Sequence, residues 1–226
     1  MTGFEEGSIT LLRREVKALL EPDEADALAR RLEDEVGATA PARVVAVYLD
    51  GSDGALARRA IAAPQDCVKL RVKCYGPDLD RRAGRVVVEV KRERGGITTK
   101  ERTWTERGLA RRAIPPTYAS IAGLAPCVAT SYLRTVHQRS QGWRVTLDRE
   151  VAFHAAGWEL FDPEAAPWAA ALARPFSTEP RVVLELKYGA PELPAWLEAL
   201  ARSRGAPYSK FTEAVVRIRP FRSLGA

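Results

Sequence analysis

Charged side chains recur at every second position in several segments of this chain that otherwise have the composition of β-strands. Lys69, Arg71 and Lys73, for example, alternate with Leu70 and Val72. A strand places successive side chains on opposite faces, so this spacing gives one apolar face and one charged face. The apolar face can pack against helices. The charged faces must then point to solvent or face one another.

The alternation is repeated along the chain. The charged positions that share a strand face are Lys69, Arg71 and Lys73; Arg85, Glu89 and Lys91; Lys100 and Arg102; Arg144, Asp148 and Glu150; and Glu185 and Lys187. For any one strand, an ordinary solvent-exposed face explains the pattern. For the whole set, the apolar opposite faces favour a closed sheet with the charges inside. We therefore expect an α+β fold, a closed antiparallel β-barrel tunnel of about eight strands with helices packed outside.

The length and the turn signals predict one domain that spans residues 1–226, since the chain shows no internal repeat and no linker. Strands are expected over 10–20, 44–50, 68–75, 85–92, 97–105, 132–139, 143–151 and 181–188. Helices are expected over 22–36, 56–61, 163–173 and 194–204, with a short helical element from 209. The stretch 109–130, rich in Ala and Pro, is expected to be a broken helix.

The composition of the chain limits the classes of partner that it is expected to bind. The net charge of +6 and a pI of about 9.4 indicate a polyanionic partner, although an Arg-rich proteome explains part of the excess. Nucleic acid is disfavoured because aromatic residues are not interleaved with the cations. Three cysteines without CxxC spacing argue against a disulfide framework or a zinc site. With no signal peptide and no membrane span, we expect a cytoplasmic protein, which leaves room for a membrane partner protein.

Lysines and arginines that face one another inside a tunnel repel and lose hydration unless an anion fills the space. A triphosphate or polyphosphate chain fits, because Arg binds phosphate oxygens with its planar fork and Lys supplies a compact charge. The acidic residues on the same faces are Glu89, Asp148, Glu150 and Glu185. They either pair with the cations or hold a divalent metal, for which hard oxygen ligands favour Mn²⁺ or Mg²⁺.

An ordered series of short motifs covers nearly the whole chain. The motifs are Arg14-Glu15-Val16-Lys17, Tyr48-Leu49-Asp50, Lys69-Leu70-Arg71-Val72-Lys73, Glu89-Val90-Lys91, Lys100-Glu101-Arg102, Arg134 to Arg139, Arg144 to Asp148, Leu184 to Tyr188, and Tyr208-Ser209-Lys210-Phe211. Each motif alone is weak, but the order resembles the VTC domain, a polyphosphate polymerase domain of the triphosphate tunnel metalloenzymes, which also include the CYTH phosphatases.

The resemblance implies roles for particular residues. The phosphate-binding set is Lys17, Arg71, Lys73, Lys91, Lys100, Arg139, Arg144 and the tunnel-end Lys210, to which Lys69, Arg102, Arg134 and Lys187 of the same motifs are added. Within it, the catalytic candidates are Lys210, Arg71, Lys73, Arg139 and Arg144. Glu185 resembles the metal-binding glutamate, with Glu89, Asp148 and Glu150 as further metal candidates. Departures from the family pattern at Ala18, Lys73 and Cys74 bear on nucleotide stacking and affinity.

The implied activity is metal-dependent transfer of the γ-phosphate of ATP, or of another nucleoside triphosphate, to a polyphosphate chain. Two alternatives keep the same fold. In a tripolyphosphatase or nucleoside triphosphatase, Glu15, Glu89 or Glu150 would orient the attacking water. In a non-catalytic module, the tunnel would bind polyphosphate without turnover.

Overall fold

The computed structural model describes residues 14–222, except 77–78, 80–83, 96, 140–141, 163, 190–192 and 206. Its centre is a nine-stranded antiparallel sheet in which the main path runs β1-β9-β7-β6-β2-β3-β4-β5, while β8 pairs with β7. The strands are β1 (Arg14–Leu20), β2 (Ala42–Asp50), β3 (Asp66–Tyr75), β4 (Arg85–Arg94), β5 (Ile97–Glu106), β6 (Ala125–Gln138), β7 (Trp143–Ala155), β8 (Ser177–Glu179) and β9 (Val182–Tyr188).

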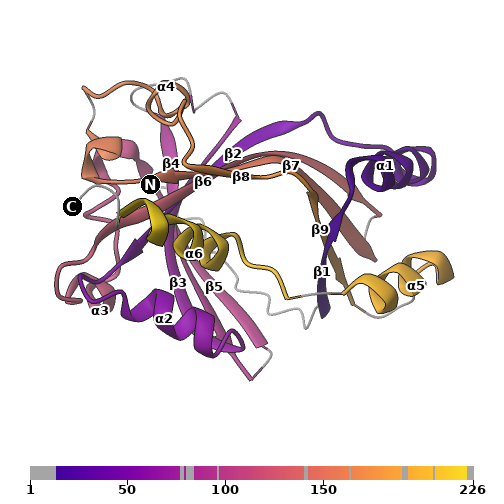
Figure 1. Cartoon of the computed structure of the whole chain (residues 1–226), viewed down its shortest axis with the longest axis horizontal. Helices are drawn as coiled ribbons and strands as arrows, with labels where there is room; N and C mark the ends of the chain where they lie inside the picture. Colours follow the sequence, from indigo (N-terminus) through magenta and orange to yellow (C-terminus); the bar gives the residue numbers. More distant parts are fainter. Residues whose placement is uncertain are drawn as a thin grey trace, which may run out of the picture.

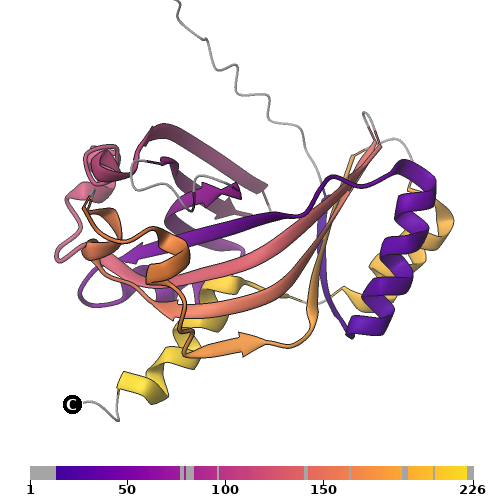
Figure 2. The same ribbon diagram turned by 90° about the horizontal axis from the view of Figure 1, so that it is seen from above.

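The sheet curls strongly, as the long strands of Figures 1 and 2 show. The curl brings its two ends towards each other, because Lys100 on β5 is close enough to Glu15 on β1 for their charges to interact. Closure into a barrel, which the alternation predicts, is not seen: no described residue of β1 pairs with β5. Lys17 on β1 and Lys100 on β5, the two edge strands of the main path, line the same cavity.

Helix α1 (Pro22–Val36) and helix α5 (Ala195–Arg204) lie together outside β1 and β9 (Figures 1 and 2). Pro22 in the first turn, two acidic residues after it, and Gly37 with φ of 72° at the end explain the bounds of α1. Both helices cover the apolar faces of β1, β7 and β9, where Leu147, Leu184 and Leu186 are fully buried. The charged faces of these strands are thereby turned inward.

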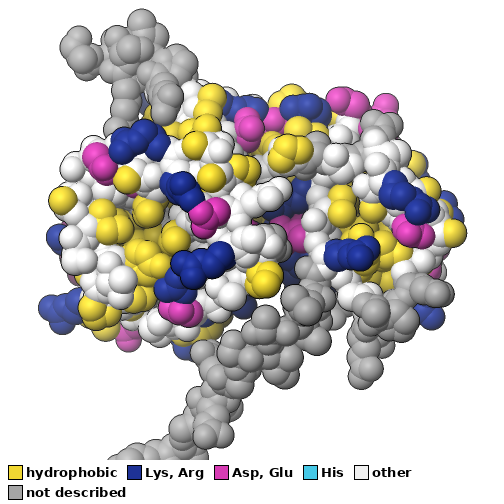
Figure 3. All heavy atoms as spheres, turned by 90° about the horizontal axis from the view of Figure 1, so that it is seen from below, with side chains coloured by type: hydrophobic (Ala, Val, Ile, Leu, Met, Phe, Trp, Pro, Cys, Tyr) yellow, Lys and Arg dark blue, Asp and Glu magenta, His cyan; other side chains and the backbone are white. Residues whose placement is uncertain are grey.

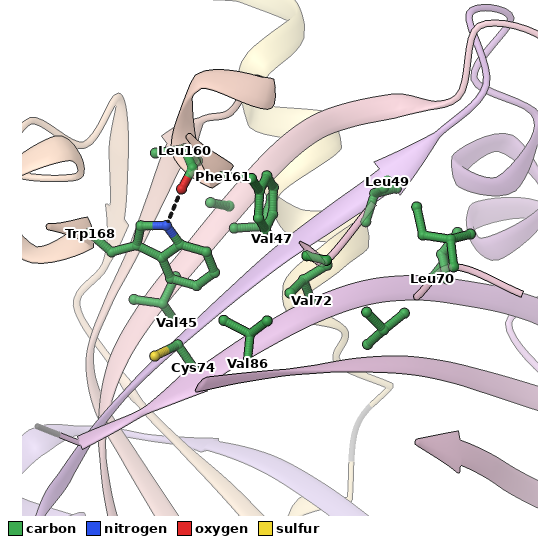
Figure 4. Packing of buried hydrophobic residues seen from close by; sticks show 14 of the residues in the cluster. Val45, Val47, Leu49, Leu70, Val72, Cys74, Val86, Leu160, Phe161 and Trp168 are labelled. Atoms are coloured by element: carbon green, nitrogen blue, oxygen red, sulfur yellow. Dashed lines mark hydrogen bonds between the residues drawn. The ribbon is translucent and has the colours of Figure 1, made fainter. Parts of the chain in front are cut away.

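A second apolar cluster covers the outer face of β2, β3 and β4 (Figure 4). Val47, Leu49, Leu70 and Val72 pack there, while the indole Nε1 of Trp168 donates to the carbonyl of Leu160 at 2.5 Å. These side chains alternate with the charged positions of the same strands. Their burial, worth roughly 1.5–3 kcal/mol for each large side chain, fixes which face is inside.

Helices α2 (Ala55–Ala62) and α6 (Lys210–Arg222) pack on the concave side. The buried carboxylate of Asp50 begins α2 by accepting from the amides of Leu56 at 2.9 Å and Ala57 at 2.8 Å. The ring of Phe211 on α6 stacks on Tyr48 of β2, with centroids 4.8 Å apart. This contact seats the start of α6, and with it Lys210, against the inner face of the sheet.

Several elements differ from the sequence-based expectation. The stretch 109–130 is not a broken helix, because β6 begins at Ala125 and only the four-residue α3 (Pro116–Ala119) and the 3₁₀ turn Arg107–Leu109 precede it. The helix expected over 163–173 is shorter in the structure, where it comprises only α4 (Trp168–Ala171). A 3₁₀ turn at Trp158–Phe161 precedes it. Strand β8 was not expected. Among the described residues, no helix combines the length and the apolar character needed to cross a bilayer.

Candidate phosphate-binding cavity

A strongly cationic cavity of about 240 Å³ lies on the concave face of the sheet. All eight strands of the main path contribute to its wall, together with Tyr208, Ser209 and Lys210 before and at the start of α6. Its eleven basic side chains are Lys17, Lys69, Arg71, Lys73, Lys91, Lys100, Arg102, Arg134, Arg144, Lys187 and Lys210, against two lining carboxylates, Glu15 and Glu185. Figure 3 shows a central hollow with basic and acidic side chains at its depth.

One buried carboxylate holds two arginines at the wall of the cavity. The side chain of Glu89 is fully buried and accepts from the Nε of Arg71 at 2.9 Å and from the Nε of Arg102 at 2.7 Å. Burial alone would raise the pKa of Glu89, but Arg71, Lys73 and Arg102 lower it well below its usual range. Glu89 therefore stays ionised and fixes two guanidinium groups, leaving their remaining N–H donors for a ligand.

A second buried carboxylate holds one arginine and one lysine. Both oxygens of Asp148 accept from Arg134, at 2.6 and 2.7 Å, and Lys210 Nζ donates to Asp148 at 2.5 Å. Burial opposes ionisation, yet Lys210 and Arg134 keep the pKa of Asp148 below its usual range. Asp148 thus ties the start of α6 to β6 and β7. We call Arg71, Arg102, Arg134 and Lys210 the clamped cations.

The two lining carboxylates lie on neighbouring strands, where Glu185 is opposite Lys17 and Glu15 is opposite Lys187. Glu15 pairs with Lys17 at 2.8 Å and with Lys187 at 3.4 Å, and Lys187 also pairs with Glu185. Burial and the neighbouring Glu185 would raise the pKa of Glu15, but Lys17, Lys91 and Lys187 lower it to about 2. Both groups are therefore anionic at neutral pH.

Four cations of the wall lack such partners. Within the described residues, no carboxylate lies within ion-pair distance of Lys69, Lys73, Lys100 or Arg144, and we call these the open cations. Burial, reinforced by Arg71, lowers the pKa of Lys73 to about 6. Burial also lowers the pKa of Lys69 and of Lys100 to about 8, with Lys91 adding to the first and Lys187 to the second.

Three polar atoms of the wall are buried without a hydrogen-bond partner among the described residues. They are the Nε of Arg144, the hydroxyl of Thr146 and the hydroxyl of Tyr208. A buried donor left unpaired costs about 1–3 kcal/mol, so such atoms at a cavity wall indicate a site built for a polar ligand. Arg144 is both an open cation and one of these three groups.

Two predicted site residues lie outside the cavity wall. Arg139 is exposed in the turn between β6 and β7, where its amide donates to the carbonyl of Trp143. Glu150 is exposed and pairs with Arg43 at 2.7 Å. A β-bulge explains Glu150: the β6–β7 register shifts beside it, and its φ of 51° breaks the alternation that places Thr146 and Asp148 inside.

Apart from Arg139, the basic candidates named from the sequence all line one cavity, including those on strands that the alternation points inward and Lys210 at the start of α6. Sequence reasoning missed the tyrosines of the wall, Tyr48, Tyr75 and Tyr132. Tyr75 has the same strand parity as Lys73 and Arg71. The alternation therefore places its ring on the cavity face, but a pattern that considers only charged residues does not include it. Lys91 has an unforeseen partner in Glu93 on its own strand.

The wall offers a partial metal site. In the described part of the chain, His, Cys, Asp and Glu side chains do not gather in a group of three that could hold an ion unaided. Glu15 and Glu185 nevertheless form a close pair of ionised carboxylates, and Mg²⁺-like ions are held by one or two carboxylates plus substrate phosphates. The pair fits a divalent cation that arrives with a phosphate chain. Glu89 and Asp148 fit less well, since each already binds two cations.

Comparison with known proteins agrees with this geometry. Residues 117–218 match the VTC domain. This match confirms the resemblance for the segment from α3 into α6, which supplies Arg134, Asp148, Glu185 and Lys210. No curated protein matches the sequence.

Several solved structures share the fold of this chain. A candidate adenylyl cyclase from Hippeastrum, described as having a dominant triphosphatase activity, matches with a TM-score of 0.53 and 14% identity, over 89% of this chain and 94% of that one. A candidate adenylate cyclase from Bacillus halodurans gives 0.53 and 14%, over 90% and 98%. A protein from Pyrococcus horikoshii gives 0.52 and 10%, over 92% and 99%. At these identities the likeness concerns the fold.

Proposed function

We propose that the cavity binds the phosphate chain of a nucleoside triphosphate and transfers the γ-phosphate to a polyphosphate acceptor. The observation that carries the proposal is the cluster of eleven basic side chains, four of which have no carboxylate within ion-pair distance among the described residues. A bound polyanion would supply the negative charge that these four cations lack, which favours its binding in the cavity. The VTC domain match supports polyphosphate as the acceptor.

The clamped cations and the open cations have different tasks in this proposal. Arg71, Arg102 and Arg134 present fixed donors that hold the bridging phosphates in line, while Lys210 lies beside Arg134 through their shared Asp148. Arg144 and Lys73 neutralise charge that shifts between donor and leaving phosphate. Glu15 and Glu185 would hold Mg²⁺ or Mn²⁺, which when bound supplies Lewis-acid stabilisation of phosphate oxygens.

The acidity of the lining carboxylates favours a phosphate acceptor over water. A phosphate oxygen is already anionic and needs no base, whereas hydrolysis is helped by a carboxylate that takes a proton from water. The pKa of Glu15 is about 2, which makes it a weak base. The second candidate function, hydrolysis of a triphosphate, is supported by the triphosphatase activity described for the Hippeastrum protein of the same fold.

Product analysis separates the candidates. The protein is incubated with ATP and Mn²⁺ or Mg²⁺, and the products are resolved by gel electrophoresis and by orthophosphate assay. We expect phosphate polymers from the native protein, and a loss of at least about 100-fold for Glu185→Gln. This loss corresponds to roughly 2.7 kcal/mol of transition-state stabilisation. Orthophosphate without polymer would replace the polymerase with a triphosphatase. Unchanged polyphosphate affinity in Glu185→Ala, with no turnover in either protein, would leave a binding module.

A further inference from the structure

An aromatic pair, of which one ring is exposed and the other half-buried, lies at one mouth of the cavity. Trp104 on β5 is 48% exposed, and its ring centroid is 6.3 Å from that of Tyr75 on β3. Tyr75 itself lines the cavity. The exposure of Trp104 beside the cavity leaves its ring available to a planar ligand.

The register places Trp104 on the cavity side of the sheet. Trp104 follows Lys100 and Arg102 at every second position of β5, and both of these line the cavity. Across the sheet Trp104 is opposite Val87, which is opposite Lys73. The aromatic pair therefore continues the row of phosphate-binding side chains past the last cations.

Cations flank both rings. The Nζ of Lys73 lies 4.7 Å from the centroid of Tyr75, and the guanidinium carbon of Arg85 lies 5.6 Å from that of Trp104. Arg85 is itself exposed. A planar group that stacks on Trp104 would meet an aromatic face and a guanidinium plane, the two surfaces on which nucleobases stack in proteins.

We propose that Tyr75, Trp104 and Arg85 form a nucleobase-stacking subsite, so that the phosphate donor is a nucleoside triphosphate bound with its base at this mouth. The inference rests on the proposed function, because it assumes that the triphosphate occupies the cavity. It adds that this mouth discriminates ATP from inorganic tripolyphosphate. Stacking is tolerant of base identity, so the subsite accepts purines and pyrimidines and favours the larger ring.

The test compares binding of ATP and of inorganic tripolyphosphate to the native protein, to Trp104→Ala and to Trp104→Phe by calorimetry. Loss of a stacking aromatic weakens nucleotide binding about tenfold or more, so Trp104→Ala should raise the Kd for ATP by that factor and leave the Kd for tripolyphosphate within twofold. Trp104→Phe should retain most of the ATP affinity. Ile97→Ala, which removes another exposed apolar side chain of β5, is the matched control and should change neither Kd.

The outcomes distinguish this inference from the proposed function. Unchanged ATP affinity in Trp104→Ala, with tripolyphosphate still bound, overturns the nucleobase subsite and leaves the phosphate cavity intact. Equal weakening for both ligands also overturns it, because the aromatic pair then supports the cavity wall and not a base. Binding of neither ligand by folded native protein overturns the phosphate cavity and the subsite together.

Discussion

The clamped cations and the open cations share one cavity but differ in how the protein supports their charge. Glu89 and Asp148, both fully buried, hold Arg71, Arg102, Arg134 and Lys210 in place. Lys69, Lys73 and Lys100 have no such support, and burial among other cations lowers the pKa of each. The clamped group is charged before a ligand arrives, whereas the lysines of the open group become fully charged when an anion does.

This contrast shows how a cavity with a large excess of cations can exist in a folded protein. Two buried carboxylates neutralise part of the charge and fix donor positions, while the lowered pKa of Lys73, about 6, leaves it largely neutral at pH 7 and so reduces the repulsion. The positive charge that remains without a carboxylate partner favours the binding of a polyanion. Substitutions that affect the clamped cations and the open cations differently therefore test this contrast most directly.

The largest effect is expected when a clamp is removed. Asp148→Asn leaves Arg134 and Lys210 buried without their counter-charge, and breaking a buried pair in this way costs about 3–5 kcal/mol of folding free energy. Urea unfolding measures the loss. Glu150→Gln is the matched control, because its exposed pair with Arg43 contributes no more than about 1 kcal/mol. A loss in Asp148→Asn as small as in this control would show that the clamp does not stabilise the fold.

An intermediate effect is expected when an open cation is removed. Arg144→Met deletes a donor whose Nε has no hydrogen-bond partner in the described part of the chain, so folding stability should stay constant or rise. Tripolyphosphate binding should weaken about 10- to 100-fold, since a hydrogen bond to a charged group contributes roughly 1.5–3 kcal/mol. Arg139→Met, three residues after Val136 of the wall but exposed in the turn, should change the Kd less than twofold. Comparable losses in the two variants would mean that the wall does not define the binding site.

The smallest effect, taken per pH unit, is the dependence of folding stability on pH. The pKa of Lys73 is about 6 in the folded protein and is near 10.5 for an unburied lysine. Between these values the unfolded chain binds more protons, so stability of the ligand-free protein rises with pH, by at most about 1.4 kcal/mol per pH unit from this group. Below pH 6 both states are protonated and the slope ends. Urea unfolding from pH 6 to 9 measures the slope, which Lys73→Met should reduce; an identical slope in the variant contradicts the assignment.

Strand parity predicted most of the cavity, because an apolar face under helices forces the alternate positions inward. It succeeded for Lys69, Arg71 and Lys73 on β3, whose neighbours Leu70 and Val72 are fully buried. It failed at Glu150, since a β-bulge adds a residue that no local pattern marks. It also could not assign partners: that Glu89 binds Arg71 and Arg102 depends on the register of three strands.

The fold was predictable in its strands and less so in its connections. The apolar, β-branched run before Thr130 belongs to β6, although Pro126 and the alanines before it favour a broken helix in isolation. The tertiary pairing with β2 overrides that local preference. The number of alternating strands does not determine whether the two edges meet, so closure of the sheet stays a prediction that the pairing of the described strands does not confirm.

The pairing of Asp148 with Lys210 has a consequence for the order in which the molecule is made. The strand that carries Glu15 leaves the ribosome early, and Lys210 follows after every strand of the sheet. At roughly 5–20 residues per second, about 10–40 seconds separate these two ends of one cavity. Only in the last roughly 1–5 seconds, after Lys187 of β9 has been made, does a nascent chain have all the strands of the wall but not the lysine that pairs with Asp148. The growing protein can therefore meet cellular nucleotides before its site is complete, and it acquires its final form only when α6 emerges.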